Sequence, residues 1–169
     1  MERLFVVMGV SGCGKSTIGE ALAAELGGTY FDGDDFHEPE KVEKMRSGTP
    51  LTDSDRWPWL WKLGKMMSEC EGVVVLACSS LKRAYRDRIT EAAGEPVLFI
   101  HLTGSEQLVT ARQAARVGHY MPPSLVHSQY ETLEPPSPDE RAVTVGIDQP
   151  PDKVLADVFA ILKERKSSE

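Results

Sequence analysis

The 169-residue chain contains no asparagine, little cysteine and no long apolar run. Without asparagine it lacks the Asn-Lys-x-Asp element with which GTPases read guanine. No apolar run approaches the roughly twenty residues needed to span a bilayer, and no signal-peptide pattern is found, so we expect a cytoplasmic protein without a membrane partner. The three cysteines are odd in number and lack metal-ligand spacing, which predicts reduced thiols and no zinc site.

Basic residues are outnumbered by acidic ones. Lys and Arg total 19 against 26 Asp and Glu, and the formal net charge is −7 at pH 7. Proteins that bind nucleic acids usually present a basic face, so we expect no nucleic-acid partner. The length suits one domain with an adequate core, and we find no internal repeat. Residues 1–169 are therefore expected to form a single domain.

A glycine-rich segment at residues 9–16 is the most informative motif. It reads Gly-Val-Ser-Gly-Cys-Gly-Lys-Ser and follows the apolar run at residues 4–8. It matches the phosphate-binding loop at every fixed position, in the strand-loop-helix context that this motif requires. The backbone N–H groups of such a loop and the N-terminus of the next helix can hold a triphosphate. The motif therefore predicts a nucleotide-binding site.

The loop residues have distinct expected roles. Lys15 should reach the β- and γ-phosphates, and the Ser16 hydroxyl should take one position on Mg²⁺. ATP is the expected nucleotide, because the guanine-reading element is absent. The other expected ATP-binding residues of the loop are Gly9, Val10, Ser11, Gly12, Cys13, Gly14 and Thr17.

Short β-rich runs alternate with helical stretches along the chain. Strands are predicted at residues 4–8, 29–31, 73–77, 97–102 and 143–147. The third and fourth runs are almost continuously apolar, as in strands of a parallel sheet covered on both faces. A last helix is predicted from about residue 151. We therefore predict an α/β fold of the three-layer P-loop NTPase or nucleoside-kinase-like type, with about five parallel strands, helices on both faces and a lid.

Several carboxylates follow the second predicted strand. Ligands of parallel sheets lie beyond the carboxyl ends of the strands, which is where the phosphate loop also lies. We expect Asp32 to orient Mg²⁺ through its waters and Asp34 to accept the proton of an attacking hydroxyl. The alternative is a solvated acidic turn that caps a helix. His37 is a weaker candidate in the same turn.

Two further polar groups are candidates for an acceptor pocket. They comprise Asp53, Asp55 and Arg56 before a tryptophan-rich stretch, and Lys82, Tyr85 and Arg86 after the third predicted strand. Arginine and lysine suit a carboxylate, and aspartates suit sugar-type hydroxyls, so the expected substrate is an anionic polyol. For residues 82–88 the alternative is an ordinary solvated basic face of a helix.

A lid is expected around residues 112–136. Arg112 and Arg116 lie four apart on a helix predicted from Ser105, where like charges repel by roughly 0.2–0.5 kcal/mol. A phosphate would relieve this repulsion, and the stretch 118–123 can leave the helix. Closure would bring arginines over the γ-phosphate and expel water. Ion pairs with surface carboxylates are the alternative role of the two arginines.

Two function classes remain after these observations. The third predicted strand ends in Cys78-Ser79-Ser80, without the aspartate that motor-type ATPases and GTPases use for Mg²⁺. A small-molecule kinase is therefore favoured, because candidates for an acceptor pocket and a lid are both present. A nucleotide-gated binding module that turns nothing over is the second hypothesis.

Together these motifs resemble the gluconate kinases, small P-loop kinases related to the shikimate and adenylate kinases, over nearly the whole chain. The resemblance rests on residues 9–16, on Asp32-Gly33-Asp34 with His37, on the stretch from Lys44 to Leu60, and on residues 78–87. Further matches are Arg112-x-x-x-Arg116-x-x-His119, Ser128-Gln129-x-x-Thr132-Leu133-Glu134 and Ile147-Asp148-Gln149-Pro150.

The resemblance implies phosphorylation of D-gluconate at its C6 hydroxyl by ATP and Mg²⁺, giving 6-phospho-D-gluconate for the pentose phosphate route. It also implies a homodimer, and a shikimate-type kinase is the alternative. The implied catalytic residues are Lys15, Asp34 and Arg116, with Ser16 and Asp32 at the metal. The implied substrate-binding residues are Asp32, Asp34, His37, Asp55, Arg56, Lys82, Arg86 and His119. A substrate-binding segment is expected around residues 35–65. Outside the loop, the implied nucleotide-binding residues are Arg112, Arg116, Gln149 and Pro150, the last two near the adenine.

Departures from the family pattern are few. Cys13 stands where a serine or another small residue is usual, which suggests that ATP binding is sensitive to thiol oxidation. Lys41 stands where asparagine is common, and it would alter substrate selection if it faced the pocket.

Overall fold

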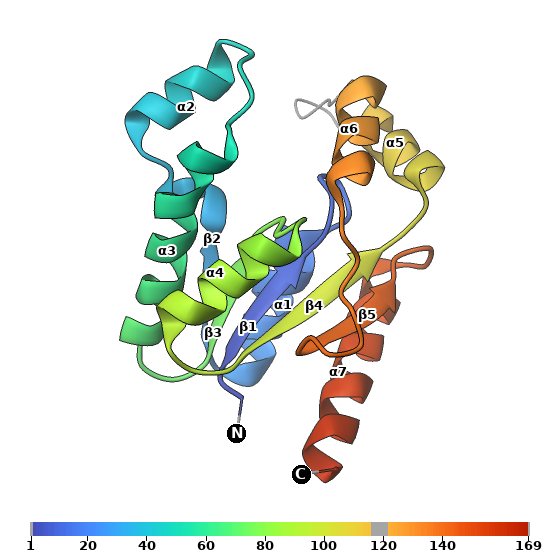
Figure 1. The fold of residues 1–169 in the computed structure, drawn as a ribbon. Helices are drawn as coiled ribbons and strands as arrows, with labels where there is room; N and C mark the ends of the chain where they lie inside the picture. Colours follow the sequence, from blue (N-terminus) through green and yellow to red (C-terminus); the bar gives the residue numbers. More distant parts are fainter. Residues whose placement is uncertain (1, 116–121, 169) are drawn as a thin grey trace.

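A five-stranded parallel sheet forms the centre of the computed structural model, which describes residues 2–115 and 122–168 (Figure 1). Its strands are β1 (Leu4–Met8), β2 (Thr29–Asp32), β3 (Val74–Ala77), β4 (Val97–Thr103) and β5 (Ala142–Gly146), in the spatial order β2-β3-β1-β4-β5. Each neighbouring pair is parallel, and Leu4 of β1 lies in register with Val74 and Val97. The predicted α/β sheet is confirmed, with strand ends that differ by one residue at several positions.

Helices cover both faces of this sheet. They are α1 (Lys15–Leu26), α2 (Pro39–Arg46), α3 (Asp53–Glu69), α4 (Arg83–Ala93), α5 (Glu106–Ala115), α6 (Pro123–Thr132) and α7 (Pro151–Ser167), with a short 3-10 helix, η1 (Gly33–Phe36), after β2. Among the described residues, no helix is both long and apolar enough to cross a bilayer.

The alternation of side chains along β1 divides the core in two. Leu4, Val6 and Met8 pack with α3 and α4 on one face, while Phe5 and Val7 pack with α1 and α7 on the other. Successive side chains of a strand point to opposite faces, so a continuously apolar strand feeds both clusters. All five β1 residues are buried.

The outermost helices bury the apolar stripes expected of them, with small differences. In α7, Val154, Val158 and Leu162 are buried, whereas Ile161 is only half-buried at the edge of the cluster. Helix α2 has no buried residue. It stands on the opposite side of the sheet's carboxyl end from α5 and α6 (Figure 1).

Close packing between α3 and α4 depends on Gly64. A Cβ atom at this position would collide with the Ile89 carbonyl oxygen and would lie 2.7 Å from the Ala92 Cβ. The two helices therefore approach to a distance that only glycine allows at this point, and their contact holds η1 and the start of α4 at the carboxyl edge.

We expect Gly64→Ala to lower the free energy of unfolding by about 1–3 kcal/mol, because the added methyl group overpacks the α3–α4 contact. Urea denaturation monitored by circular dichroism measures this change. Gly146→Ala is the matched control, since a Cβ there meets nothing within 4 Å. Equal stability of the two variants would contradict the packing argument.

Candidate active site

A cavity of about 830 Å³ lies at the carboxyl ends of β1, β2 and β3. The phosphate loop forms one wall, and Asp32 and Asp34 form part of another. Cys78 and Ser79 after β3 lie between them, and Arg112 of α5 completes the lining. The parallel sheet thus brings together segments that are far apart in the sequence, as expected for the crevice at the carboxyl ends of strands.

Glycines determine the path of the phosphate loop. Gly9, Gly12 and Gly14 have φ angles of 145°, 87° and 98°, in the left-handed region that other residues rarely adopt. A Cβ at Gly9 would lie 2.7 Å from the Cys13 Sγ and 2.8 Å from the Leu102 carbonyl oxygen. The loop can therefore close tightly over the end of β1 and lead directly into α1.

The Lys15 side chain folds back over this loop. Its Nζ donates hydrogen bonds to the carbonyl oxygens of Gly9 at 3.1 Å and Val10 at 3.0 Å. The ammonium group lies over the loop and lines the same cavity as Ser16. The arrangement supplies a positive charge, helix N–H groups and a hydroxyl in one place, which together suit a triphosphate.

Cys13 is buried beneath the loop. Burial raises the pKa of its thiol, which keeps the group protonated. Oxidants attack exposed thiolates, so this environment argues against the expectation that Cys13 makes ATP binding sensitive to oxidation. Cys13 instead serves as a small apolar group against Gly9.

Asp32 caps a helix, which is one of the two roles that the sequence left open, and it also lines the cavity. Its Oδ1 accepts a hydrogen bond from the Asp34 N–H at 3.0 Å, so it caps η1. Its side chain also lines the cavity that contains Lys15. Partial burial raises the pKa of Asp32, and the nearby carboxylates of Asp34 and Asp35 add to this effect. The carboxylate is thus held rigidly at the edge of the phosphate site.

Asp34 lies beside His37 at the same edge. The His37 Nε2 is 3.7 Å from the Asp34 Oδ1, and this contact lowers the pKa of Asp34. The His37 ring stacks on Trp59, with centroids 4.1 Å apart and the planes at 21°. Trp59 in turn donates a hydrogen bond from Nε1 to the Gly33 carbonyl oxygen at 2.9 Å. Helix α3 therefore holds the acidic turn in place.

Arg56 and Lys82 meet at one carboxylate. The Arg56 Nη1 and the Lys82 Nζ each lie 3.4 Å from an oxygen of Asp53. Tyr85 donates its hydroxyl hydrogen to Asp53, and both cations lie over the Tyr85 ring at 5.5 and 5.6 Å from its centroid. We call these four residues, Asp53, Arg56, Lys82 and Tyr85, the α3–α4 polar cluster. It gathers two cations at the carboxyl edge of the sheet.

Asp55 connects α2 to the start of α3. Its Oδ1 accepts a hydrogen bond from Lys41 at 2.8 Å, and its Oδ2 accepts from Lys44 at 2.6 Å and from the Thr52 N–H at 2.8 Å. The two lysines hold the pKa of Asp55 far below its usual range. Both oxygens are engaged in capping α3 and fastening α2 to it, so these contacts give Asp55 a structural role, and its binding of substrate stays a prediction. The Lys41 ammonium is engaged in the same contact.

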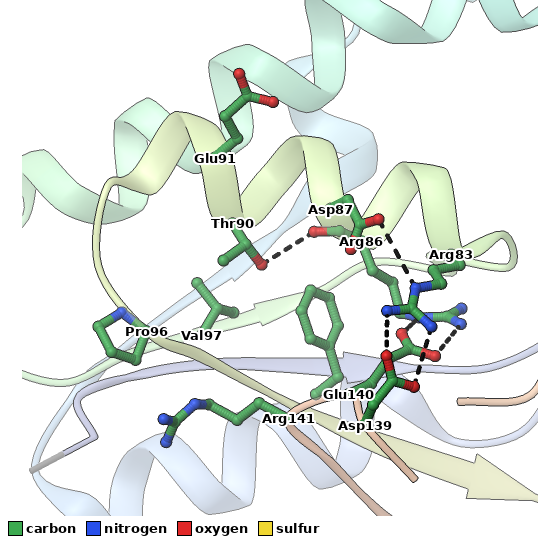
Figure 2. A pocket seen from close by; sticks show the side chains of 11 residues that line it. Arg83, Arg86, Asp87, Thr90, Glu91, Pro96, Val97, Asp139, Glu140 and Arg141 are labelled. Atoms are coloured by element: carbon green, nitrogen blue, oxygen red, sulfur yellow. Dashed lines mark hydrogen bonds and ion pairs between the residues drawn. The ribbon is translucent and has the colours of Figure 1, made fainter. Parts of the chain in front are cut away.

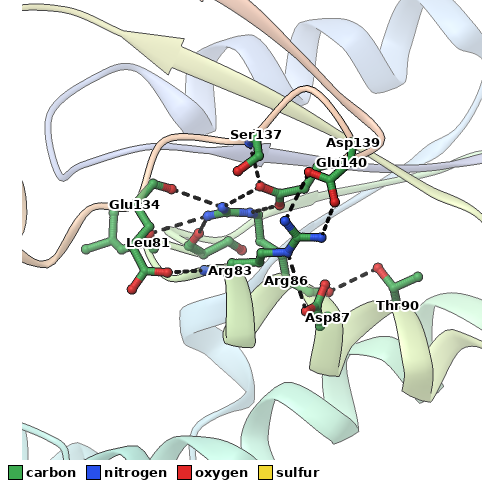
Figure 3. A network of polar contacts seen from close by, with 10 residues as sticks. Leu81, Arg83, Arg86, Asp87, Thr90, Glu134, Ser137, Asp139 and Glu140 are labelled. Atoms are coloured by element: carbon green, nitrogen blue, oxygen red, sulfur yellow. Dashed lines mark hydrogen bonds and ion pairs between the residues drawn. The ribbon is translucent and has the colours of Figure 1, made fainter.

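Arg86 is engaged in a buried network of polar contacts. Figure 3 shows its buried guanidinium paired with Glu140, with Nε 2.7 Å from Oε1 and Nη2 3.1 Å from Oε2. The remaining N–H groups donate to the carbonyl oxygens of Ser80, Leu81 and Glu134. Burial alone would raise the pKa of Glu140, but the hydrogen bonds from Arg86 lower it. With its donors occupied in this way, Arg86 has a structural role, and its binding of substrate stays a prediction.

A second cavity, of about 380 Å³, lies beside α4 and β4 (Figure 2). Four of its charged lining residues, Arg83, Arg86, Asp139 and Glu140, are engaged in ion pairs with one another. The Arg83 Nη2 lies 2.6 Å from Asp139, and Arg86 is paired with Glu140. No residue of the phosphate loop lines this cavity. We therefore assign the chemistry to the larger cavity.

The expected nucleotide-binding residues outside the loop lie near α5 and α7. Arg112 lines the larger cavity and donates a hydrogen bond from Nη2 to the Ile147 carbonyl oxygen at 2.6 Å. Gln149 donates from Nε2 to the Gly146 carbonyl oxygen and to Asp157, and Pro150 caps α7. Pro151, the next residue, reaches the cavity. The expected residues Arg116 and His119 lie outside the described residues.

One contact to the loop was missed by sequence reasoning. Gln129 of α6 accepts a hydrogen bond from the Ser11 N–H at 2.6 Å. Gln129 lies in a stretch that carries the family resemblance, but the two residues are 118 positions apart and the residue type alone does not indicate this contact.

We expect Arg86→Met to lower the free energy of unfolding by about 3–5 kcal/mol, because Glu140 would remain buried without its partner. Chemical denaturation measures the loss. Lys82→Met serves as the comparison, because this lysine is a third exposed and its loss leaves no buried charge unpaired. If Arg86→Met kept full stability and only weakened substrate binding, the structural assignment would be overturned.

Comparisons with known proteins give matches over most of the chain. A family profile described as "AAA domain" matches residues 4–136. The "Gluconokinase" of Gluconobacter oxydans (strain 621H) is 44% identical over 162 residues, which cover 93% of this chain and 89% of that protein. The "Thermoresistant gluconokinase" of Escherichia coli (strain K12) is 40% identical over 170 residues, which cover 98% and 96% of the two chains.

Solved structures show the same similarity. The crystal structure of a gluconokinase from Sinorhizobium meliloti 1021 matches with a TM-score of 0.90 and 44% identity, over 98% of this chain and 94% of that one. Shikimate kinase from Aquifex aeolicus matches with a TM-score of 0.65 and 16% identity, over 98% and 99% of the two chains. The latter likeness concerns the fold alone.

Proposed function

Because this chain belongs to the gluconokinase family and is therefore a kinase, we propose that it transfers the γ-phosphoryl group of ATP to D-gluconate, giving 6-phospho-D-gluconate. One observation carries the proposal. A single cavity joins the phosphate loop to Asp32 and Asp34, with the cations Arg56 and Lys82 at the same edge of the sheet. A donor site, a proton acceptor and a place for an anionic polyol thus adjoin one another.

Binding of ATP is assigned to the loop. Its N–H groups and the N-terminus of α1 surround the phosphates, and Lys15 neutralises charge as it spreads over the transferring group. Helices α5 and α6 stand above the loop, and Arg112 reaches the cavity from α5. We assign these helices the role of a lid that limits the access of water to the phosphoryl group.

The residues at the cavity suit Mg²⁺. This ion keeps several of its waters and takes only one or two protein oxygens besides those of phosphates. Ser16 and Asp32 offer a hydroxyl and a carboxylate in the same cavity. When bound with ATP, Mg²⁺ would offset negative charge on the phosphates. Partial burial is the main cause that raises the pKa of Asp32, and the carboxylates of Asp34 and Asp35 add to it, so a bound cation would favour the ionised form of Asp32.

Asp34 is placed to orient the acceptor hydroxyl. It is exposed to the cavity, and its lowered pKa keeps it ionised, so it can accept a hydrogen bond and then the proton. Its carboxylate is held beside His37, which rests on Trp59. Positioning of the hydroxyl by a fixed carboxylate supplies most of what phosphoryl transfer needs.

The α3–α4 polar cluster is the proposed site for the rest of gluconate. Arg56 and Lys82 provide positive charge for the carboxylate of the substrate. Asp53 and Tyr85 can exchange their present contact for hydrogen bonds to substrate hydroxyls. The homodimer and the cytoplasmic location remain predictions.

An assay of acceptors tests the proposal directly. The purified protein is incubated with ATP and Mg²⁺ and with gluconate, shikimate, glycerate or AMP, and the product is identified by mass. Selective turnover of gluconate supports the proposal. Turnover of shikimate instead would replace the acceptor while keeping the kinase chemistry, and ATP binding without turnover of any acceptor would favour the nucleotide-gated binding module.

Lys15→Met should lower kcat by about 10²–10³-fold while the protein stays folded, because one preorganised charge at the transferring group is lost. Steady-state kinetics and circular dichroism check the two parts. Lys65→Met, at an exposed position on α3, is the control and should leave kcat unchanged. A Lys15→Met enzyme with near-normal kcat would rule out the assigned role.

Lys82→Met should raise the KM for gluconate at least tenfold and leave the KM for ATP within twofold, because it removes one charge from the α3–α4 polar cluster alone. Initial rates at varied concentrations of each substrate measure both constants. An equal rise of the two KM values would show that the cluster does not distinguish gluconate from ATP.

A further inference from the structure

Two glutamines connect the helices above the site to the phosphate loop. Gln129 comes from α6 and Gln113 from α5, and both contact the leading half of the loop, at Ser11 and Gly12. Nothing in the motif of the loop requires partners on these helices. The two side chains come from different helices but contact adjacent loop residues, so both restrain the same part of the loop.

The contact of Gln129 is a short hydrogen bond. Its Oε1 lies 2.6 Å from the Ser11 nitrogen and accepts that N–H. Ser11 lies in a loop whose glycines at positions 9, 12 and 14 leave the backbone free to rotate. An acceptor fixed on a helix therefore determines the orientation of the peptide group before Ser11, and with it the direction of the neighbouring N–H groups.

Gln113 of α5 packs against the next residue of the loop, Gly12. Its side chain is 2% exposed, and its amide nitrogen would lie 2.6 Å from a Cβ at Gly12. Its Oε1 is buried and has no hydrogen-bond partner among the described residues. A buried amide without a partner for its oxygen is uncommon, so packing against Gly12 is the contact that explains its position.

Ordinary packing of α5 and α6 does not need these amides. Each helix already has a buried valine in the core, Val109 in α5 and Val126 in α6. Apolar residues would serve equally well if anchoring were the only requirement. The hydrogen bond between Gln129 and the Ser11 N–H additionally fixes the position of α6 relative to the loop.

We propose that Gln129 is a positioning residue for phosphoryl transfer, which orients the loop through the Ser11 N–H and ties α6 to it. The inference rests on the proposed function, because it takes the loop as the ATP site. The amide oxygen holds one N–H so that those that follow, up to Ser16, stay directed at the phosphates. Gln113 limits movement of the same segment by packing against Gly12.

Three variants test the proposal. Gln129→Met keeps the length of the side chain and removes the acceptor, whereas Gln129→Glu keeps an acceptor oxygen. Gln107→Met is the matched control, because Gln107 is exposed on α5. The measurements are amide hydrogen exchange at Ser11, titration calorimetry with ATP, and steady-state kinetics with ATP and gluconate.

Gln129→Met should speed exchange of the Ser11 amide at least tenfold and lower kcat about tenfold, while the KM for gluconate stays within twofold. Gln129→Glu should keep the Ser11 amide protected, since its carboxylate can still accept the hydrogen bond, but bind ATP more weakly because it adds a negative charge next to the loop. Gln107→Met should match the parent protein in all three measurements.

Rapid exchange of the Ser11 amide in the parent protein would overturn the proposal even if a variant failed to fold. So would a Gln129→Met enzyme with kcat within twofold of normal. Hydrogen exchange and ATP calorimetry need no acceptor, so they remain decisive if gluconate is not the substrate. In that case the parent protein does not turn over gluconate, and this result contradicts the proposed function alone.

Discussion

Parallel pairing of β1 with β3 and β4 is the constraint on which the site depends. Because these strands run in one direction, each of them ends at the same edge of the sheet. The phosphate loop, the acidic turn after β2 and the segment after β3 are thereby brought to one cavity. A slip in register by one residue would also turn the side chains of β1 to the wrong faces and break both halves of the core.

Fixed geometry at this edge comes from contacts that lie outside the cavity. Trp59 holds the carbonyl of Gly33, Asp55 fastens α2 to the start of α3, and Arg86 joins α4 to Glu134 and Glu140. None of these groups needs to touch a substrate to matter. Each removes a movement that would shift Asp34 or the α3–α4 polar cluster relative to the loop, and small shifts in a reacting geometry lower the rate strongly.

The fold and the phosphate loop could be predicted because their signals are local. Apolar runs indicate β3 and β4. The glycines and Lys15 lie in one short segment, and their spacing is typical of the phosphate-binding loop. The structural contacts of Asp55 and Arg86 could not be predicted, for the opposite reason. Their residue types suit a substrate, but the partners that engage them come from other segments, such as Glu140, 54 positions beyond Arg86. Charge and spacing alone do not indicate which charges are already paired.

A crystal structure with D-gluconate and a non-hydrolysable ATP analogue tests the central claim most directly, namely that one cavity presents the acceptor hydroxyl to the phosphate loop. The account predicts the C6 hydroxyl within hydrogen-bond distance of Asp34, facing the γ-phosphate, and the carboxylate between Arg56 and Lys82. Gluconate bound with its carboxylate toward Asp34, or seated in the cavity beside α4 and β4, would contradict it.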